Sequence, residues 1–190
     1  MNNSDLFIII NKFAGRSSLL DRSMIFVASY LIFIIPLFLV FLWFKRSKDN
    51  ENKRTALFIF ISVVFSVIIG WGISLFYFHP RPFMIGMGKE LIRHSSETSF
   101  PSDHATAMFA VSFSLLFLKK YLKGVIFFMF SFLVGFARVF CGIHFPFDIV
   151  GSFFVAFVGT GIIFILKEKL DILFERIIEI YLSIEREWLK

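Results

Sequence analysis

The sequence has a single cysteine, Cys141, so the chain cannot form an internal disulfide. It contains no internal repeat and no low-complexity segment. No small-residue cleavage site follows the first long apolar run, which we therefore expect to be retained as a span. The length of 190 residues allows one domain and no separate soluble module.

Apolar residues are abundant instead. They make up 57% of the chain, whereas an ordinary soluble domain has about 45–50%. The mean hydropathy is +0.79, and the 30 phenylalanines fit helices that face lipid. Because the excess is concentrated in long runs, the composition indicates a membrane protein.

Five apolar segments are candidate membrane-spanning helices, since a span needs about 20 apolar residues. The third is short for a span and starts with polar residues. We expect an all-α fold, a polytopic bundle with about five transmembrane helices. The segments are 25–44, 57–78, 102–118, 124–140 and 147–166.

Shorter helices are expected at both ends of the chain. Residues 5–13 are apolar but too few to cross a bilayer, which favours an interfacial helix. In 167–190, apolar residues recur at helical spacing with charged residues between them. This pattern predicts an amphipathic tail helix that anchors to the membrane surface or packs on a partner. We divide the chain into a membrane-embedded domain, 1–166, and this tail.

The net charge is +6 and the sequence pI is about 9.6. The cations lie in short loops between apolar runs, so we interpret them as topology signals and contacts to anionic lipid, with no role in binding nucleic acid. With five spans, one face carries thirteen Lys and Arg residues and the other carries seven. The richer face is expected to be cytoplasmic, which places the long loop 79–101 and the turn 141–146 together outside.

Three polar clusters interrupt the apolar pattern, at 79–82, 99–104 and 138–148. Ionisable residues at membrane depth are costly and usually functional. Two spans separate the second cluster from the third, so the chain leaves one face and returns to it. All three clusters can therefore meet at a single site.

The residue types in these clusters suit phosphate. Arg81 and Arg138 are fixed cations whose fork geometry matches phosphate oxygens. Ser102 follows a proline and precedes an apolar helix, where it is a good N-cap. A helix N-terminus also offers free N–H groups to an anion.

The clusters also contain residues that could act as a nucleophile and as a general acid. His144 and Asp148 are four residues apart, so the carboxylate can hold one imidazole nitrogen while the other faces a substrate. His104 remains to protonate a leaving oxygen. Together these groups predict a phosphoryl-transfer site that needs no metal and no cofactor.

The clusters resemble the type 2 phosphatidic acid phosphatase superfamily, whose pattern is K-x6-R-P, then P-S-G-H, then S-R-x5-H-x3-D. The match covers 74–148 and is most similar to bacterial undecaprenyl-diphosphate phosphatases of the bacitracin-resistance type. The matching residues are Arg81, Pro82, Pro101, Ser102, His104, Arg138, His144 and Asp148. The resemblance implies that His144 is the nucleophile, oriented by Asp148, that His104 is the acid, and that the arginines and Ser102 bind phosphate.

The family's activity is implied in the same way: hydrolysis of undecaprenyl diphosphate to the monophosphate through a phosphohistidine, at the outer face of the bacterial plasma membrane, in recycling the cell-wall lipid carrier. A polyprenyl diphosphate and membrane lipids would be the partners. The sequence leaves a homo-oligomer open. It also leaves open another lipid phosphatase, acting on phosphatidylglycerophosphate or phosphatidic acid, or a small anion transporter. The membrane setting disfavours a haloperoxidase.

The sequence departs from the family pattern at three places. The lysine of the first block falls at Ser74, the glycine of the second is Asp103, and the serine before Arg138 is an alanine. We expect Asp103 to act as a second N-cap residue. Lys89 and Arg93 are candidates to replace the missing lysine. His79, His94 and Trp71 we interpret as interfacial anchors or packing residues.

Overall fold

The structure, a computed structural model, describes residues 2–188 and the side chains of 2–187. The last two residues of the predicted tail lie outside this range, and one of them is Lys190, which we counted with the cytoplasmic cations. The described residues contain helices and no strand, which confirms the predicted all-α class. The elements are α1 (Asn3–Asn11), α2 (Ser18–Tyr30), η1 (Leu31–Phe33), α3 (Ile34–Phe44), η2 (Lys48–Asn50), α4 (Glu51–Phe76), η3 (Pro82–Ile85), α5 (Asp103–Phe117), α6 (Tyr121–Phe140), α7 (Pro146–Ile165) and α8 (Lys167–Trp188).

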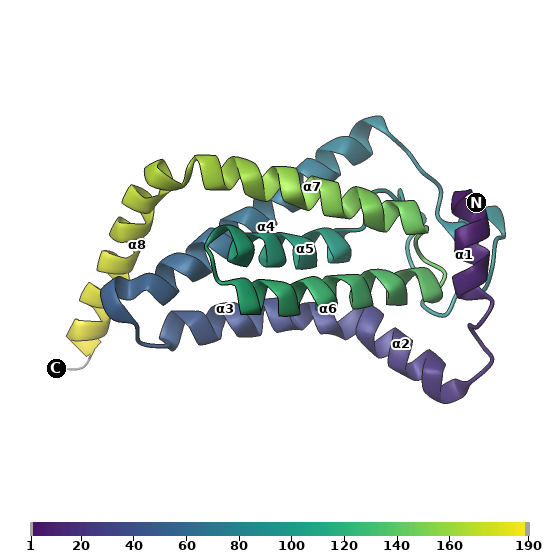
Figure 1. Ribbon diagram of the computed structural model, residues 1–190, viewed down its shortest axis with the longest axis horizontal. Helices are drawn as coiled ribbons and strands as arrows, with labels where there is room; N and C mark the ends of the chain where they lie inside the picture. Colours follow the sequence, from purple (N-terminus) through teal and green to yellow (C-terminus); the bar gives the residue numbers. More distant parts are fainter. Residues whose placement is uncertain (1, 189–190) are drawn as a thin grey trace.

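Four helical segments of residues 2–188 are long and apolar enough to cross a membrane: Ser18–Phe44, Lys48–Phe76, Tyr121–Phe140 and Pro146–Ile165. The third predicted span forms α5, which has only 15 residues. It lies between α6 and α7 and also packs on α4 (Figure 1). Eleven of its residues are buried, so protein rather than lipid covers it and it does not need full span length.

The first span is longer than the hydrophobic run suggests and is broken in the middle. It begins at Ser18, where the side chain of Ser17 accepts the Leu20 N–H. A short 3₁₀ turn, η1, then separates α2 from α3. Pro36 follows in the first turn of α3 and cannot donate a backbone hydrogen bond, which accounts for a local change of helix type.

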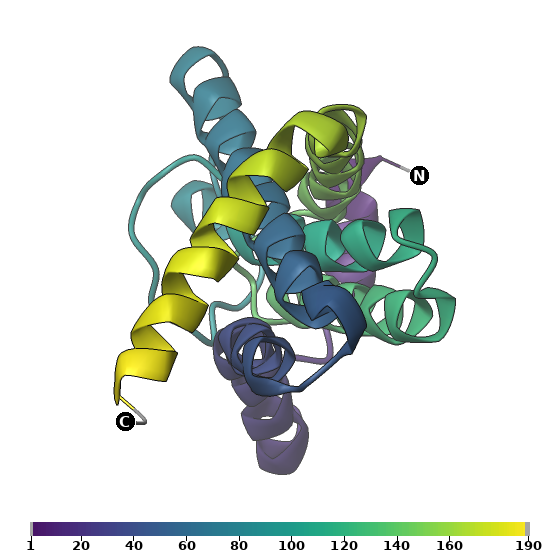
Figure 2. The same ribbon diagram turned by 90° about the vertical axis from the view of Figure 1, so that its left-hand side faces the viewer.

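The two terminal helices lie across opposite ends of the bundle (Figures 1 and 2). The side chain of Asn11 donates to the carbonyls of Lys89 and Phe140 and accepts the Lys89 N–H, so α1 is fixed to the long loop and to the end of α6. At the other end, α8 is held to α4 by an ion pair of 2.7 Å between Arg54 and Glu175.

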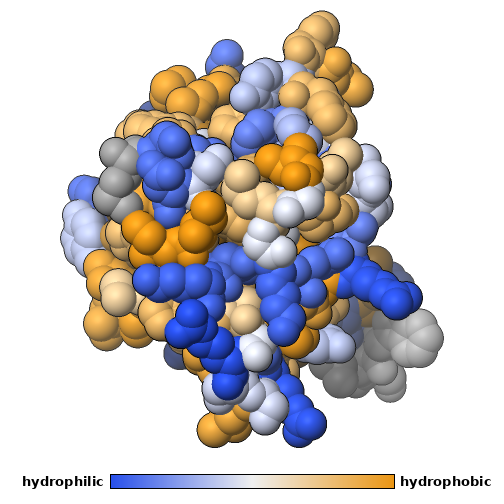
Figure 3. Space-filling model, turned by 90° about the vertical axis from the view of Figure 1, so that its right-hand side faces the viewer, coloured by the Kyte–Doolittle hydropathy of each residue, from blue (hydrophilic) through white to orange (hydrophobic). Residues whose placement is uncertain are grey.

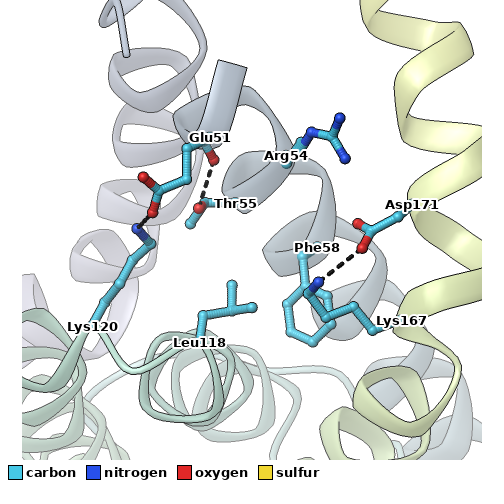
Figure 4. Close-up of a pocket in the computed structure, with 8 residues that line it drawn as sticks. All are labelled: Glu51, Arg54, Thr55, Phe58, Leu118, Lys120, Lys167 and Asp171. Atoms are coloured by element: carbon cyan, nitrogen blue, oxygen red, sulfur yellow. Dashed lines mark hydrogen bonds and ion pairs between the residues drawn. The ribbon is translucent and has the colours of Figure 1, made fainter. Parts of the chain in front are cut away.

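Charged residues also surround a small pocket between α4, the α5–α6 turn and α8 (Figure 4). Lys120 pairs with Glu51 at 2.6 Å, and Lys167 pairs with Asp171 at 2.8 Å within α8. The cations that predicted the cytoplasmic face thus also form ion pairs at this end of the bundle, and the pair of Arg54 with Glu175 joins the tail helix to α4.

Aromatic rings fill the bundle between α5, α6 and α7. Phe109 of α5 is fully buried and packs edge-on against Phe128, Phe132 and Phe153 at centroid distances of 5.3–5.8 Å. A glycine allows α7 to pack closely on α4, because a Cβ at Gly159 of α7 would collide with Ser66 of α4.

The helix ends meet the long loop at one end of the molecule. The N-termini of α5 and α7, the C-terminus of α6 and residues 77–102 all lie there (Figure 1). Hydrophilic residues gather across this face, amid apolar ones (Figure 3). The three polar clusters of the sequence are therefore at the same end.

Candidate active site

A cavity of about 540 Å³ opens at this end of the bundle. Its walls combine the C-terminal part of α4, the first turns of α5, the end of α6, the turn before α7 and the long loop. The lining residues are Ile32, Val67, Trp71, Ser74, Leu75, Arg81, His94, Glu97, Thr98, Pro101, Asp103, His104, Ala107, Arg138 and His144. Four of the six residues assigned to catalysis and phosphate binding line it: Arg81, His104, Arg138 and His144.

Arg81 and Arg138 present two buried guanidinium groups to the same atom. Nη1 of Arg81 and Nη2 of Arg138 each lie 3.2 Å from Nε2 of His144. Arg81 also donates to the Ile143 carbonyl at 2.9 Å, and Arg138 to the Ala28 carbonyl at 3.3 Å. Nε of Arg138 is buried with no partner among the described residues. Two cations with unused donors make this part of the cavity a site for an anion.

The tautomer of His144 follows from its neighbours. Its Nδ1 lies 2.9 Å from the main-chain oxygen of Ser99, which can only accept, so Nδ1 carries the proton. The lone pair of Nε2 then points at the two arginines. Complete burial, with the nearby Arg138 and Arg81, lowers the pKa of His144 to about 3 despite its contact with Asp148. The imidazole is therefore neutral, as a nucleophile requires.

Asp148 lies further from His144 than a direct hydrogen bond allows, with 3.6 Å between Oδ2 and Nδ1. Oδ2 accepts the hydroxyl of Ser99 and, at 2.7 Å, the N–H of Phe145. Oδ1 is 3.0 Å from Nδ1 of His79. Ser99 thus bridges the two residues: its main-chain oxygen accepts the Nδ1–H of His144, and its hydroxyl donates to Asp148.

His104 lies in the first turn of α5 and faces the cavity. Within residues 2–188 its imidazole has no hydrogen-bond partner, in contrast to the other three histidines. An imidazole without a protein partner at the cavity wall is available to a substrate.

Ser102 and Asp103 differ from expectation. Ser102 is the N-cap residue of α5, but its hydroxyl makes no capping bond, is buried without a partner in the described chain, and does not line the cavity. Its backbone N–H donates to the hydroxyl of Ser152 at 2.9 Å. Asp103 does line the cavity, but as the first residue of the helix and not as a cap. It accepts the indole N–H of Trp71 at 3.2 Å.

Neither loop cation proposed to replace the missing lysine lines the cavity. Ser74 lines the cavity with its hydroxyl near the Gly70 and Phe100 carbonyls, at 3.0 and 3.2 Å. The side chain of Lys89 instead lies against Gly15, and Arg93 is not among the lining residues.

His94, which we interpreted as an anchor, lines the cavity instead. Its Nε2 is 3.3 Å from Nη2 of Arg138. Burial, together with the charges of Arg81 and Arg138, lowers the pKa of His94 and favours the neutral imidazole.

Sequence reasoning gave no site role to Ser99, His79, His94 or Trp71, although Ser99 and His79 belong to the polar clusters that were expected to meet. One signal was available: all four histidines of the chain lie between positions 79 and 144, within or beside the three polar clusters. The described residues contain no group of three or more His, Cys, Asp and Glu placed to hold a metal.

Comparison with known proteins identifies the family of this chain. The family model of the PAP2 superfamily matches residues 55–171. Undecaprenyl-diphosphatase BcrC of Bacillus subtilis is 31% identical over 182 residues, which cover 96% of this chain and 93% of the relative.

Two solved structures share the fold. LpxE of Aquifex aeolicus has a TM-score of 0.71 at 25% identity and covers 84% of this chain and 92% of its own. The PAP2-type phosphatidylglycerolphosphate phosphatase of Bacillus subtilis has a TM-score of 0.64 at 22% identity, with coverages of 89% and 84%. With the family match spanning most of the chain, this protein belongs to the PAP2 superfamily and is a multi-pass membrane phosphatase.

Proposed function

We propose that the protein hydrolyses undecaprenyl diphosphate to undecaprenyl phosphate and inorganic phosphate. One observation supports this most directly: the Nε2 lone pair of buried, neutral His144 faces two guanidinium groups in a cavity at one end of the bundle. The similarity to an undecaprenyl-diphosphatase along nearly the whole chain favours this lipid over other phosphorylated lipids.

Binding begins with an exchange of partners at the two arginines. In the free protein, Arg81 and Arg138 donate to Nε2 of His144, which blocks that lone pair. A phosphate oxygen is a stronger acceptor than a neutral imidazole, so the terminal phosphate takes these donors and frees Nε2. The N-terminus of α5 adds partial positive charge, and we assign Ser102 to fixing that helix start beside the phosphate.

In the first step, Nε2 of His144 attacks the terminal phosphorus. The bond from phosphorus to the bridging oxygen breaks, and its electron pair leaves with undecaprenyl phosphate, whose oxygen takes a proton from His104. Burial and the charge of Arg138 lower the pKa of His104 to about 3 in the free protein, so the negative charge of the bound diphosphate is what keeps this imidazole protonated for the step. Positive charge develops on the imidazole of His144. Its Nδ1–H is held by the main-chain oxygen of Ser99, and the carboxylate of Asp148 at 3.6 Å stabilises the charge.

In the second step, water attacks the phosphohistidine while His104, now neutral, accepts the water proton. The nitrogen–phosphorus bond breaks and inorganic phosphate is released. His144 returns to its neutral form with Nδ1 protonated. Every proton transfer in this scheme uses a residue of the chain, and no cofactor is invoked.

We place the cavity at the extracytoplasmic face of the bacterial plasma membrane. This placement is supported by the excess of Lys and Arg at the opposite end of the bundle, where the pocket of Figure 4 also lies. In that orientation the enzyme meets the lipid carrier where cell-wall polymer has been transferred from it.

The test is phosphate release by purified protein in detergent, with EDTA and without any gradient. Undecaprenyl diphosphate, phosphatidylglycerophosphate and phosphatidic acid compete as substrates. We expect preference for the polyprenyl diphosphate and no release by His144→Ala. Preference for phosphatidylglycerophosphate or phosphatidic acid would favour the alternative that the protein is another lipid phosphatase. No phosphate release from any substrate would favour the alternative of a small anion transporter.

Cys141→Ala is the matched control, because it changes a buried residue of the same turn. Burial raises the pKa of the Cys141 thiol to about 12, so it stays protonated and takes no part in the scheme. The control should retain wild-type activity. Phosphate release by folded His144→Ala would refute the assignment of the nucleophile.

A further inference from the structure

His79 occupies a defined place behind the cavity. Its ring does not line the cavity, but its Nδ1 lies 3.0 Å from Oδ1 of Asp148. Asp148 is completely buried, and Oδ1 has no other hydrogen-bond partner in the described part of the chain. The Ser99 and Phe145 donors both serve the second oxygen, Oδ2, which faces His144. The carboxylate is thus held between the histidine of the scheme and a second histidine.

The backbone of His79 is fixed on both sides. Its N–H donates to the hydroxyl of Thr98 at 3.0 Å, and its carbonyl accepts the N–H of Ser99 at 2.7 Å. Its ring stacks on Tyr77, with a centroid distance of 6.1 Å and an interplanar angle of 15°, and lies 5.2 Å from the ring of Phe145. An interfacial anchor needs no such arrangement, so the reading of His79 as an anchor does not explain it.

We propose that His79 is a positioning residue that holds Asp148 toward His144 and makes the charge available to His144 depend on pH. The proposal rests on the proposed function, because it takes His144 as the nucleophile. The imidazole of His79 is then a second imidazole in contact with the same carboxylate. It acts through Asp148 and does not touch the substrate.

The direction of the pH effect follows from the charges around His79. Asp148 is the charged group in contact with it, and the other elements packed on it present the hydroxyl of Thr98 and the rings of Tyr77 and Phe145. The hydrogen bond to Asp148 raises the pKa of His79 above 6.5, against the opposing effect of partial burial.

Below that pKa, His79 carries a positive charge that offsets Asp148. The carboxylate then stabilises less of the charge that develops on His144, so kcat falls as the pH drops through the pKa of His79. His144 itself cannot produce this acid limb near neutrality, because its own pKa is about 3.

Three substitutions separate the donor from the ring. His79→Phe keeps an aromatic ring but removes the hydrogen bond, and His79→Asn places an amide N–H close to the position of Nδ1–H. His79→Gln places its amide where Nε2 lies and serves as the matched control. For His79→Phe and His79→Gln we expect kcat to fall about 10- to 100-fold, because each variant loses a hydrogen bond to a charged group. KM should change little. His79→Asn should retain most of kcat but lose the acid limb, since an amide does not titrate.

A direct titration tests the same coupling without catalysis. Histidine NMR signals of the full-length protein in detergent report the pKa of His79, which we expect to fall in Asp148→Asn. A purely structural role would reduce the yield of folded protein without moving the acid limb. Wild-type kcat in His79→Phe, an acid limb that persists in His79→Asn, or a His79 pKa unchanged in Asp148→Asn would overturn the proposal. Failure of the proposed function would appear differently, as wild-type protein that releases no phosphate or as an active His144→Ala.

Discussion

Replacing Asp148 by asparagine removes one charge from the site while keeping the size of the side chain. In the wild type, Oδ2 of Asp148 lies 3.6 Å from Nδ1 of His144. We take this distance as the separation between the carboxylate and the positive charge that develops on the imidazole. At an effective dielectric constant of about 20, unit charges at this distance attract by about 4.6 kcal/mol. Since about 1.36 kcal/mol corresponds to a tenfold change in rate, kcat should fall by about three orders of magnitude.

The assay is steady-state phosphate release from undecaprenyl diphosphate, on protein shown by size-exclusion chromatography and thermal unfolding to be folded. KM should change little, because Asp148 does not line the cavity. Asp171→Asn is the matched control: it removes a carboxylate from a partly exposed pair at the opposite end of the molecule and should leave kcat unchanged. A loss of kcat below about tenfold in Asp148→Asn would refute the charge-stabilisation argument.

Four further substitutions test other parts of the mechanism and the fold. Ser99→Ala removes the hydroxyl donor to Asp148 but keeps the main-chain acceptor for His144, so kcat should fall about tenfold; a loss as large as that of Asp148→Asn would contradict this. His94→Ala should raise KM about fivefold, the worth of one hydrogen bond, while Lys89→Ala leaves it unchanged; the reverse pattern in substrate-saturation curves would show that the loop lysine serves the phosphate. Gly159→Leu places a side chain against the backbone of α4 and should destabilise the fold by about 1–3 kcal/mol; an unchanged Tm in detergent would contradict the close packing of α4 and α7.

Hydropathy was sufficient to predict the helices because a bilayer-spanning segment must satisfy its own backbone polar groups. Hydropathy alone, however, predicted five similar membrane-spanning helices, and one of the five differs from the others. α5 is shorter than a span and almost wholly enclosed by α4, α6 and α7, a feature that depends on packing between distant parts of the chain. The break at η1 was foreseeable in principle from Pro36, but a proline in the first turn of a helix is also common without a break.

The site was predictable where sequence spacing fixes geometry. His144 and Asp148 are four apart, and the alternation of spans brings them to the same end as His104 and Arg81. The connection between His144 and Asp148 was not predictable in detail, because it passes through Ser99.

Residues 77–102 explain the remaining differences. Apart from the short turn η3, this loop has no helical repeat from which side-chain directions can be read. Its path is set by tertiary contacts, such as Arg81 with the Ile143 carbonyl and Asn11 with the backbone of Lys89. These contacts turn His94 toward the cavity and Lys89 away from it, although the sequence analysis named Lys89 as a neighbour of the phosphate and interpreted His94 as an anchor.

The central claim, that His144 takes up the phosphoryl group, is tested most directly by trapping the intermediate. Protein mixed with undecaprenyl diphosphate labelled in its terminal phosphate is quenched in alkali within the first turnover and mapped by mass spectrometry. The account predicts phosphate on the imidazole of His144, and none in His144→Ala. Label on another residue, or burst kinetics with label retained in His144→Ala, would contradict it.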